Sequence, residues 1–202
     1  MNWVYWVAAA CVYAEFVGYW VHILLHGHRI RFLSRAHMIH HLVVYSPDRS
    51  LRPSSEYLGS TQGRAHVVGI GLEWLAPLGL ILAATAAALR AAGAAPGHEA
   101  AFLATALAWG YGMFGVMHDR MHVRGSRWEN LPGIGAWFRR VRRLHDIHHL
   151  RLTDDGTMAY NYGICFFVFD RLFGSLRQDH ARFNPVGFAA AKRRYAFVFS
   201  AR

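Results

Sequence analysis

The stretch AAFLATALAWGYGMFGVMHDRMH, residues 100–122, decides the fold of this chain. Its first eighteen residues, Ala100 to Met117, are uncharged and mostly apolar. That length approaches the roughly 20 residues that an α-helix needs to cross the hydrocarbon core of a bilayer. His118 and His122 follow at once, four residues apart, so the predicted span ends in two imidazoles on one helical face.

Two further apolar runs precede this one, from about Asn2 to Leu25 and from about Val67 to Leu89. The first run has no basic segment before it, so we interpret it as a span and not as a cleaved signal. Residues 91–99, AAGAAPGHE, predict a short turn, which makes spans two and three a helical hairpin. We therefore expect residues 1–202 to form a single, all-α domain, an integral-membrane bundle of about three to four spanning or re-entrant helices.

The formal net charge of +10 follows a clear distribution along the chain. Residues 26–65 carry six arginines and residues 119–202 carry fifteen lysines and arginines, whereas only Arg90 lies at the other end of a span. Cytoplasmic segments of membrane proteins are enriched in Lys and Arg, so we expect the N-terminus outside and the C-terminus in the cytoplasm. No module that reads nucleic acid is recognisable, so no nucleic-acid partner is expected.

Ten of the fourteen histidines fall into four tight groups. The groups are His22 and His26; His37, His40 and His41; His118 and His122; and His145, His148 and His149. Because spacings of three and four share a helical face, each group can aim two or three imidazoles at one point. The predicted topology places all four groups on one side of the membrane. Ten imidazoles are too many for one ion and suit two, so we predict a di-metal site in a cytosolic helical cap, with iron, zinc, copper or nickel as the metal.

The other four histidines are not predicted to be ligands. They are His28, His66, His98 and His180. Among them, His28 in the sequence HGH remains an alternative to His26. The two cysteines lie far apart with no CxxC spacing, so they indicate neither a disulfide framework nor a thiolate site.

Three acids are candidates for orienting the ligands, because a ligating histidine usually donates its other N–H to a carboxylate or a carbonyl. Asp119 and Asp146 each follow a predicted ligand, and Glu15 lies seven residues before His22 on the same face of the first span. For Glu15 the alternative is a buried acid satisfied by a neighbouring helix.

Two segments after the third span are less regular. Residues 136–144, AWFRRVRRL, place Trp137, Val141 and Leu144 on one helical face and arginines on the other. This pattern suits a helix in the membrane interface, or an amphipathic helix packed on the domain core. Residues 164–176, ICFFVFDRLFGSL, are apolar but interrupted by charge, and predict a buried or re-entrant helix.

The four histidine groups resemble the fatty acid hydroxylase / sterol desaturase superfamily of membrane di-iron proteins. That family shows HxxxH or HxxxxH, then HxxHH, and after a membrane hairpin a further HxxxH and a final HxxHH. Here these motifs occupy residues 22–26, 37–41, 118–122 and 145–149. The closing FDRLFGSL and the sequence Asn161-Tyr162-Gly163 are also similar to the region that follows the last motif there. The resemblance covers about residues 15–177.

The resemblance implies two iron ions and dioxygen as co-substrate, with hydroxylation or desaturation of a C–H bond of a lipid. It adds Asn161 as a weaker candidate beside the ligands. Zinc can occupy such sites in purified protein, since it outcompetes ferrous iron. Some members carry a fused haem domain of the cytochrome b5 type, for which this chain has no room. A separate electron donor, a ferredoxin, cytochrome or reductase, is therefore expected.

Two other functions remain open from the sequence. The motifs HDRMH and HDIHH are also similar to bacterial carotenoid ring hydroxylases, although those lack the FDRLFGSL ending. A non-redox membrane metal-binding or carrier protein would use the same histidines, although transport sites tend to lie at the membrane midplane. Gly110, Gly112 and Gly115 in the third span favour close helix packing, with space for a lipid chain as the alternative.

Overall fold

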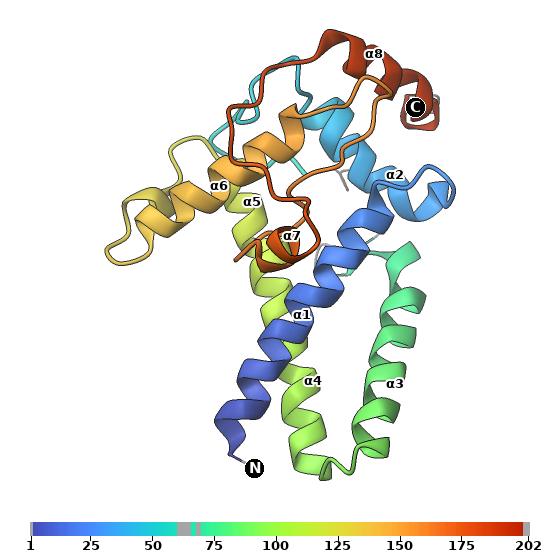
Figure 1. Cartoon of the computed structure of the whole chain (residues 1–202), viewed down its shortest axis with the longest axis vertical. Helices are drawn as coiled ribbons and strands as arrows, with labels where there is room; N and C mark the ends of the chain where they lie inside the picture. The colour runs from blue at the N-terminus through green and yellow to red at the C-terminus, as the bar shows by residue number, and fades with distance from the viewer. Residues whose placement is uncertain (1, 60–65, 68–69, 200–202) are drawn as a thin grey trace.

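The computed structural model describes residues 2–59, 66–67 and 70–199. Three long helices form a stem, and the remaining helices gather in a head at one end of it (Figure 1). The N-terminus lies at the far end of the stem and the chain ends in the head. Within the described residues the only strands are β1 (His66–Val67) and β2 (Ile70–Gly71), a two-residue antiparallel pair, so the fold is helical as predicted.

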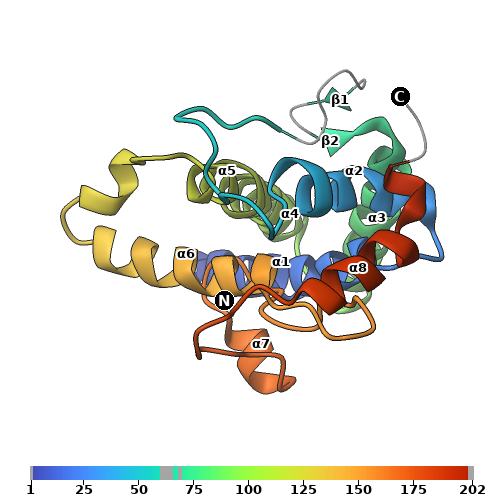
Figure 2. The ribbon, with the colours of Figure 1, turned by 90° about the horizontal axis from the view of Figure 1, so that it is seen from above.

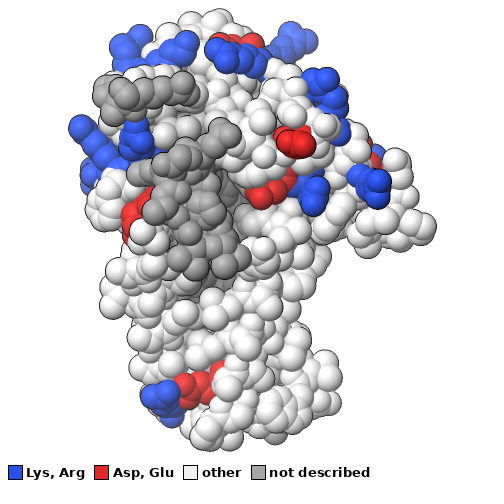
Figure 3. Space-filling view, turned by 180° about the vertical axis from the view of Figure 1, so that it is seen from behind, with Lys and Arg blue, Asp and Glu red and all other residues white. Residues whose placement is uncertain are grey.

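The stem consists of α1 (Trp3–Leu25), α3 (Leu75–Ala91) and α4 (Pro96–Gly110). A 3-10 turn, η2 (Leu72–Trp74), leads into α3, and a π-helical segment, η3 (Tyr111–Met117), carries α4 on into the four-residue α5 (His118–Met121). Three helices are thus long and apolar enough to cross a membrane: Trp3–Leu25, Leu72–Ala91 and Pro96–Met121. On the face shown in Figure 3, Lys and Arg gather over the head, and a further basic and acidic patch lies near the far end of the stem.

Two of the predicted span boundaries were wrong. The second helix begins at Leu72 and not near Val67, because Val67 lies in β1. The third begins at Pro96, which we had placed in the turn. Proline suits the first helical position, where its missing N–H has no intrahelical partner to lose. The turn is therefore shorter than predicted and contains Gly93 with a φ of 77°.

The three stem helices are not equally close to one another. Helices α1 and α4 lie side by side along their length, whereas α3 stands apart from α1 in Figure 1. A hydrogen bond between the Tyr13 and Thr85 hydroxyls joins α1 to α3. At the head end, the Trp74 indole N–H donates to the Leu33 carbonyl at 3.1 Å. A Cβ added at Gly110 or Gly112 would meet no atom within 4 Å, so the packing that we favoured for these glycines does not occur with the described residues.

The head is built around the continuations of the stem. It contains α2 (Arg31–Ile39) with a π-helical extension η1 (His40–Val44), η4 (Arg127–Asn130), α6 (Gly135–Leu150), α7 (Val168–Leu172), α8 (Pro185–Arg194) and η5 (Ala196–Val198). One apolar cluster joins the head end of the third span to α6 through Met117, Met121 and Phe138. A second joins α2 to α8 through Met38, Phe188 and Tyr195. Figure 2 shows α6 and α8 from above, across the top of α1.

Helix α6 packs on the core, which was the second of our two alternatives for residues 136–144. Phe138, Val141 and Leu144 are buried in the first apolar cluster. The arginines are not all on the outer face, since Arg142 is only 6% exposed. Its guanidinium donates to the Met121 and Val123 carbonyls, both at 2.9 Å. Because its guanidinium donors have these partners, the charged Arg142 side chain can be buried in the head.

The segment 164–176 does not form the continuous helix, buried or re-entrant, that we predicted. Its only helix is the five-residue α7, and Phe166, Val168, Leu172 and Phe173 are exposed. The interrupting charge explains the difference, because the Asp170 carboxylate turns inward and accepts hydrogen bonds from Tyr162 N, Gly163 N and Ser175 Oγ. These bonds close a compact loop, and a longer helix would break them.

Candidate metal centre

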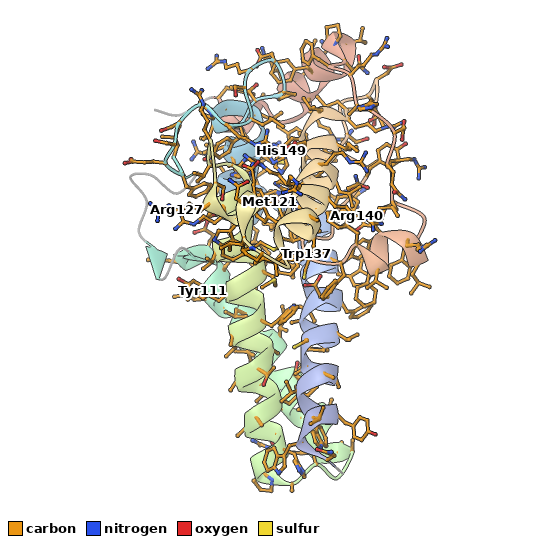
Figure 4. The ribbon with its side chains drawn as sticks, turned by 90° about the vertical axis from the view of Figure 1, so that its left-hand side faces the viewer. Tyr111, Met121, Arg127, Trp137, Arg140 and His149 are labelled. Carbon is orange, nitrogen blue, oxygen red and sulfur yellow. The ribbon has the colours of Figure 1, made fainter. Side chains whose placement is uncertain are left out.

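The ten predicted histidines converge in the head as two groups of five. The first group is His22, His26, His37, His41 and His148, and the second group is His40, His118, His122, His145 and His149. Within each group, one ring nitrogen from every histidine lies within 4.8 Å of all the others. The groups touch one another, since the rings of His41 and His149 are stacked with centroids 4.0 Å apart. Figure 4 shows His149 beside Met121, between α5 and α6.

The three-histidine motifs do not each aim at one point, which corrects our expectation. His37 and His41 of HMIHH join the first group, whereas His40 joins the second. In HDIHH, His148 joins the first group, whereas His145 and His149 join the second. Adjacent residues on a helix differ in direction by about 100°. Each double histidine therefore supplies both groups, and α2–η1 and α6 are shared between them.

The nitrogens that face one another are spaced like ligands of a common ion. His26 Nε2 lies 3.0 Å from His37 Nε2 and 3.1 Å from His148 Nε2. His145 Nε2 lies 3.0 Å from His122 Nε2 and 3.2 Å from His149 Nε2. Two nitrogens bound to one ion at about 2.1 Å are separated by about 3.0 Å at a right angle and about 3.4 Å at a tetrahedral angle. Both groups fit a metal ion by this measure.

Buried nitrogens without partners support the same fit. Among the described residues, His22 Nε2 and His40 Nε2 are buried and make no hydrogen bond, and neither ring nitrogen of the buried His41 makes one. An unpaired buried polar atom costs about 1–3 kcal/mol. Such a cost at both groups is explained if these residues serve as metal ligands.

In the first group, two ring orientations are fixed by the loop that contains Asn161. His22 Nδ1 lies 2.5 Å from the Tyr162 carbonyl, and His148 Nδ1 lies 2.6 Å from the Tyr160 carbonyl. A donating Nδ1–H leaves the Nε2 lone pair free for a metal. Asn161 stands between these two carbonyls with a φ of 57°, a left-handed conformation that asparagine tolerates. Its side chain is completely buried.

In the second group, the orienting groups come from residues 45–57. His122 Nδ1 donates to the Leu51 carbonyl at 3.1 Å, and His149 Nδ1 donates to the Tyr45 carbonyl at 3.3 Å. The Tyr45 ring also stacks on His122, with centroids 4.0 Å apart. The Tyr57 hydroxyl lies 3.3 Å from His40 Nδ1. Sequence reasoning missed these residues, because backbone carbonyls leave no signal and tyrosines are common in apolar segments.

Four buried histidines of the head, His41, His145, His148 and His149, are held in the neutral form. Burial, followed by the neighbouring imidazoles, lowers the pKa of His41, His145 and His149 well below the ordinary value. Burial likewise lowers the pKa of His148 to about 4, against the opposing effect of its bond to Tyr160. Neutral imidazole is the form that binds metal. The least buried members of the two groups are His37 and His118. The side chain of His118 is 12% exposed.

The predicted orienting acids lie in different surroundings. Asp119 Oδ1 is 3.5 Å from His118 Nδ1, which places it beside a candidate ligand. Asp146 pairs with Arg52 at 2.6 Å, and no hydrogen bond joins it to a histidine within the described part of the chain. Glu15 accepts from the Trp109 indole at 2.8 Å. Glu15 is thus a buried acid satisfied by a neighbouring helix, the alternative that we had kept open.

Three of the remaining four histidines, His28, His98 and His180, lie outside both groups. His28 is exposed next to His26, so His26 and not His28 faces the site. His98 packs against Trp3 and Trp6 at the far end of the stem, with centroids 4.5 and 5.2 Å away. His66 lies in β1, and His180 is exposed in the head.

Comparison with protein families gives one match, in which the model of the family described as fatty acid hydroxylase covers residues 7–175. This range includes all ten histidines and ends within the FDRLFGSL segment. No curated protein matches the chain, and no solved structure matches it.

Proposed function

We propose that this chain, which belongs to the fatty acid hydroxylase family, is an integral-membrane oxygenase that hydroxylates or desaturates a C–H bond of a lipid with two iron ions and dioxygen. The observation that carries the proposal is the pair of adjacent five-histidine groups. Neither group contains a carboxylate or a thiolate, and imidazole ligands suit iron, copper and zinc better than magnesium or calcium. Two ferrous ions held there would supply the redox chemistry that attacks an unactivated C–H bond.

The position of the groups suits an apolar substrate. His22 belongs to the last turn of α1, and His118 directly follows η3 at the head end of the third span. A lipid chain lying along the stem would therefore reach the candidate ligands without entering water. The partial exposure of His37 and His118, one from each group, leaves both groups accessible from outside. An acyl chain or a sterol-like lipid meets this description.

The protein's own residues prepare the site and keep it dry. The carbonyls of Tyr160, Tyr162, Leu51 and Tyr45 hold four rings in fixed tautomers. Eight of the ten histidines are buried, so little water reaches them and competing reactions are suppressed. Hydroxylation by one dioxygen consumes two electrons and two protons and gives an alcohol and water. Desaturation consumes the same electrons and protons and gives an alkene and two waters.

The membrane orientation is part of the proposal. The basic head and the C-terminus lie in the cytoplasm and the N-terminus lies outside, because Lys and Arg concentrate in the segments that leave the head end of the stem. The reductant is then cytoplasmic, on the side where the histidine groups lie.

The test uses protein loaded anaerobically with ferrous iron in lipid nanodiscs, a chemical reductant and isotopically labelled dioxygen. We expect one labelled oxygen atom in a lipid product, or loss of two hydrogens from it. His145→Ala should abolish the product, and His180→Ala is the matched control because that histidine is exposed and belongs to neither group. Turnover of a carotenoid alone would favour the ring hydroxylase. No product from any lipid class, with both ions bound and exchanging within seconds, would favour a metal carrier.

A further inference from the structure

A wide-open surface cavity of about 420 Å³ lies along the outer side of α6. Its lining comprises Arg52, Gly125, Glu129, Arg139, Arg142, Arg143 and Asp146. Four of these seven residues belong to α6 at spacings of three and four, so they form one helical face. A second cavity of about 460 Å³ shares Glu129 and Arg139 and extends the hollow toward residues 130–136.

The charges in this cavity do not cancel. Four arginines and two acids leave a net charge of +2 among the lining residues. Each acid is already paired, Asp146 with Arg52 and Glu129 with Arg142. Arg139 donates only to the Glu129 backbone carbonyl, and no hydrogen bond or ion pair engages Arg143 among the described residues. Two exposed guanidinium groups therefore face the cavity without a carboxylate partner.

The cavity lies next to the second histidine group. Asp146 directly follows His145 along α6. Arg52 directly follows Leu51, whose carbonyl accepts the hydrogen bond from His122 at 3.1 Å. The wall of the cavity is thus one residue away from the candidate ligand His145, and it is joined to the candidate ligand His122 through Leu51 and one hydrogen bond.

We propose that the arginine-lined cavity is the docking surface for a small acidic electron-carrier protein that reduces the metal centre. The inference rests on the proposed function, which requires two electrons for each turnover. A one-electron carrier would be oxidised as it passes one electron to a ferric ion of the second group, so two dockings serve one turnover. Complementary charge steers such encounters and raises the association rate, mainly at low salt.

The position of the cavity favours a protein over a lipid headgroup as the occupant. In Figure 4, Trp137 lies at the boundary between stem and head, where aromatic residues mark a membrane interface. Arg142, Arg143 and Asp146 lie further along α6, on the way to His149 inside the head. A headgroup at the boundary would meet residues 130–136 first, whereas a docked protein would cover the wall beside His145.

The test measures reduction of ferric-loaded protein in nanodiscs by a reduced plant-type 2Fe–2S ferredoxin, an acidic one-electron carrier, in a stopped-flow instrument. The variant is Arg139→Glu with Arg143→Glu, two exposed residues of α6. The matched control is Arg182→Glu with Arg193→Glu, which changes the net charge equally at exposed sites near α8. We expect the second-order rate to fall at least about tenfold in the cavity variant and to be retained in the control. The difference should shrink at about 0.5 M salt.

The docking proposal would be overturned if the rate of reduction by ferredoxin did not change in the cavity variant, or if it fell equally in the control. It would also be overturned if the cavity variant lost bound phosphatidylglycerol in native mass spectrometry while the ferredoxin rate stayed unchanged. That last result would assign the cavity to a lipid. Failure of the proposed function is distinguishable. Binding of oxidised ferredoxin to zinc-loaded protein needs no redox chemistry and therefore tests the docking surface alone. If this binding depends on the two arginines but the iron-loaded protein holds no reducible iron, the oxygenase proposal is contradicted and the docking proposal stands. Reduction by dithionite in both variants shows that the metal centre itself is sound.

Discussion

Asn161 provides the sharpest test of the candidate site, because one side chain controls two candidate ligands. Its amide donates to the Leu144 and Arg177 carbonyls, both at 2.9 Å, and its oxygen accepts from Arg177 N at 2.7 Å. These bonds hold the backbone so that the carbonyls on either side of Asn161 face His22 and His148. Asn161→Ala removes all three bonds and leaves a residue that disfavours a φ of 57°.

The magnitude follows from these contacts. One of the three bonds is buried and two are half-buried. At about 1 kcal/mol for each bond, the three together cost roughly 3 kcal/mol. The left-handed conformation adds about 1 kcal/mol for alanine, which Asn161→Gly avoids. Loss of one group that orients a ligand typically lowers metal affinity about 10- to 100-fold, and here two orienting carbonyls move together. We therefore expect a fall of roughly 100-fold or more in affinity at the first group alone.

The assay is metal stoichiometry of purified protein at limiting iron or zinc, with thermal unfolding beside it. Asn161→Ala should retain about one ion, because the carbonyls of Leu51 and Tyr45 that serve the second group lie elsewhere. Asn184→Ala is the matched control, since that asparagine also makes three hydrogen bonds, to Leu152 O, Asp154 Oδ1 and Gly187 N. It should lower stability and keep both ions. Two ions in Asn161→Ala, or the same loss in the control, would refute the reasoning.

Three further predictions concern the two groups. His40→Ala with His145→Ala removes two histidines of the second group and should leave about one bound ion, whereas His41→Ala with His145→Ala removes one histidine from each group and should leave none. Equal metal stoichiometry in the two double variants would contradict the assignment. The metal-free protein should lose stability as pH falls below about 6.5: burial lowers the pKa of His145 and His149 in the folded state, so the unfolded chain binds more protons there. A melting temperature in detergent that stays flat or rises between about pH 7.5 and 5.5 would be inconsistent with this. Tyr57→Phe removes only the hydroxyl that contacts His40 Nδ1, at about 0.5–1.5 kcal/mol, so metal affinity at the second group should fall less than about tenfold; a larger loss would assign Tyr57 a greater role than orientation.

The sequence predicts the stem well because its signals are local. A helix that crosses a bilayer needs only length and apolar composition, and both are visible in residues 100–117. The boundaries were less certain, as Val67 and Pro96 show, because strand pairing and the first helical position depend on backbone geometry. The prediction for residues 164–176, which contain α7, was wrong for a different reason. Its shape is set by the three hydrogen bonds that Asp170 accepts from residues nearby in space, and the apolar composition does not reveal them.

The ligand candidates were predictable, whereas the groups that orient them were not. Histidines at spacings of three and four are rare enough to be noticed, and the structure brings all ten together. The orienting groups are mainly carbonyls of residues 45, 51, 160 and 162, and every residue carries a carbonyl. An acid next to a ligand in sequence need not face it, because adjacent residues on a helix point in different directions: Asp119 lies beside His118, whereas Asp146 does not lie beside a histidine. Asp146 faces Arg52 in the outer cavity for that reason.

The same helical geometry explains why two of the motifs end in a double histidine. A helix that flanks a two-ion site from one side needs ligands in one direction only, and the pairs His22–His26 and His118–His122 on the first and third spans serve one group each. A helix that lies between the two ions must point ligands in two directions about 100° apart, which adjacent residues do. The doublets His40–His41 and His148–His149 thus mark α2–η1 and α6 as the helices between the groups. One alanine inserted between the two histidines of either doublet keeps the number of histidines but changes their relative direction. It should rotate one ligand out of its group and cost one ion. Two bound ions in such a variant would show that the doublets have no directional role.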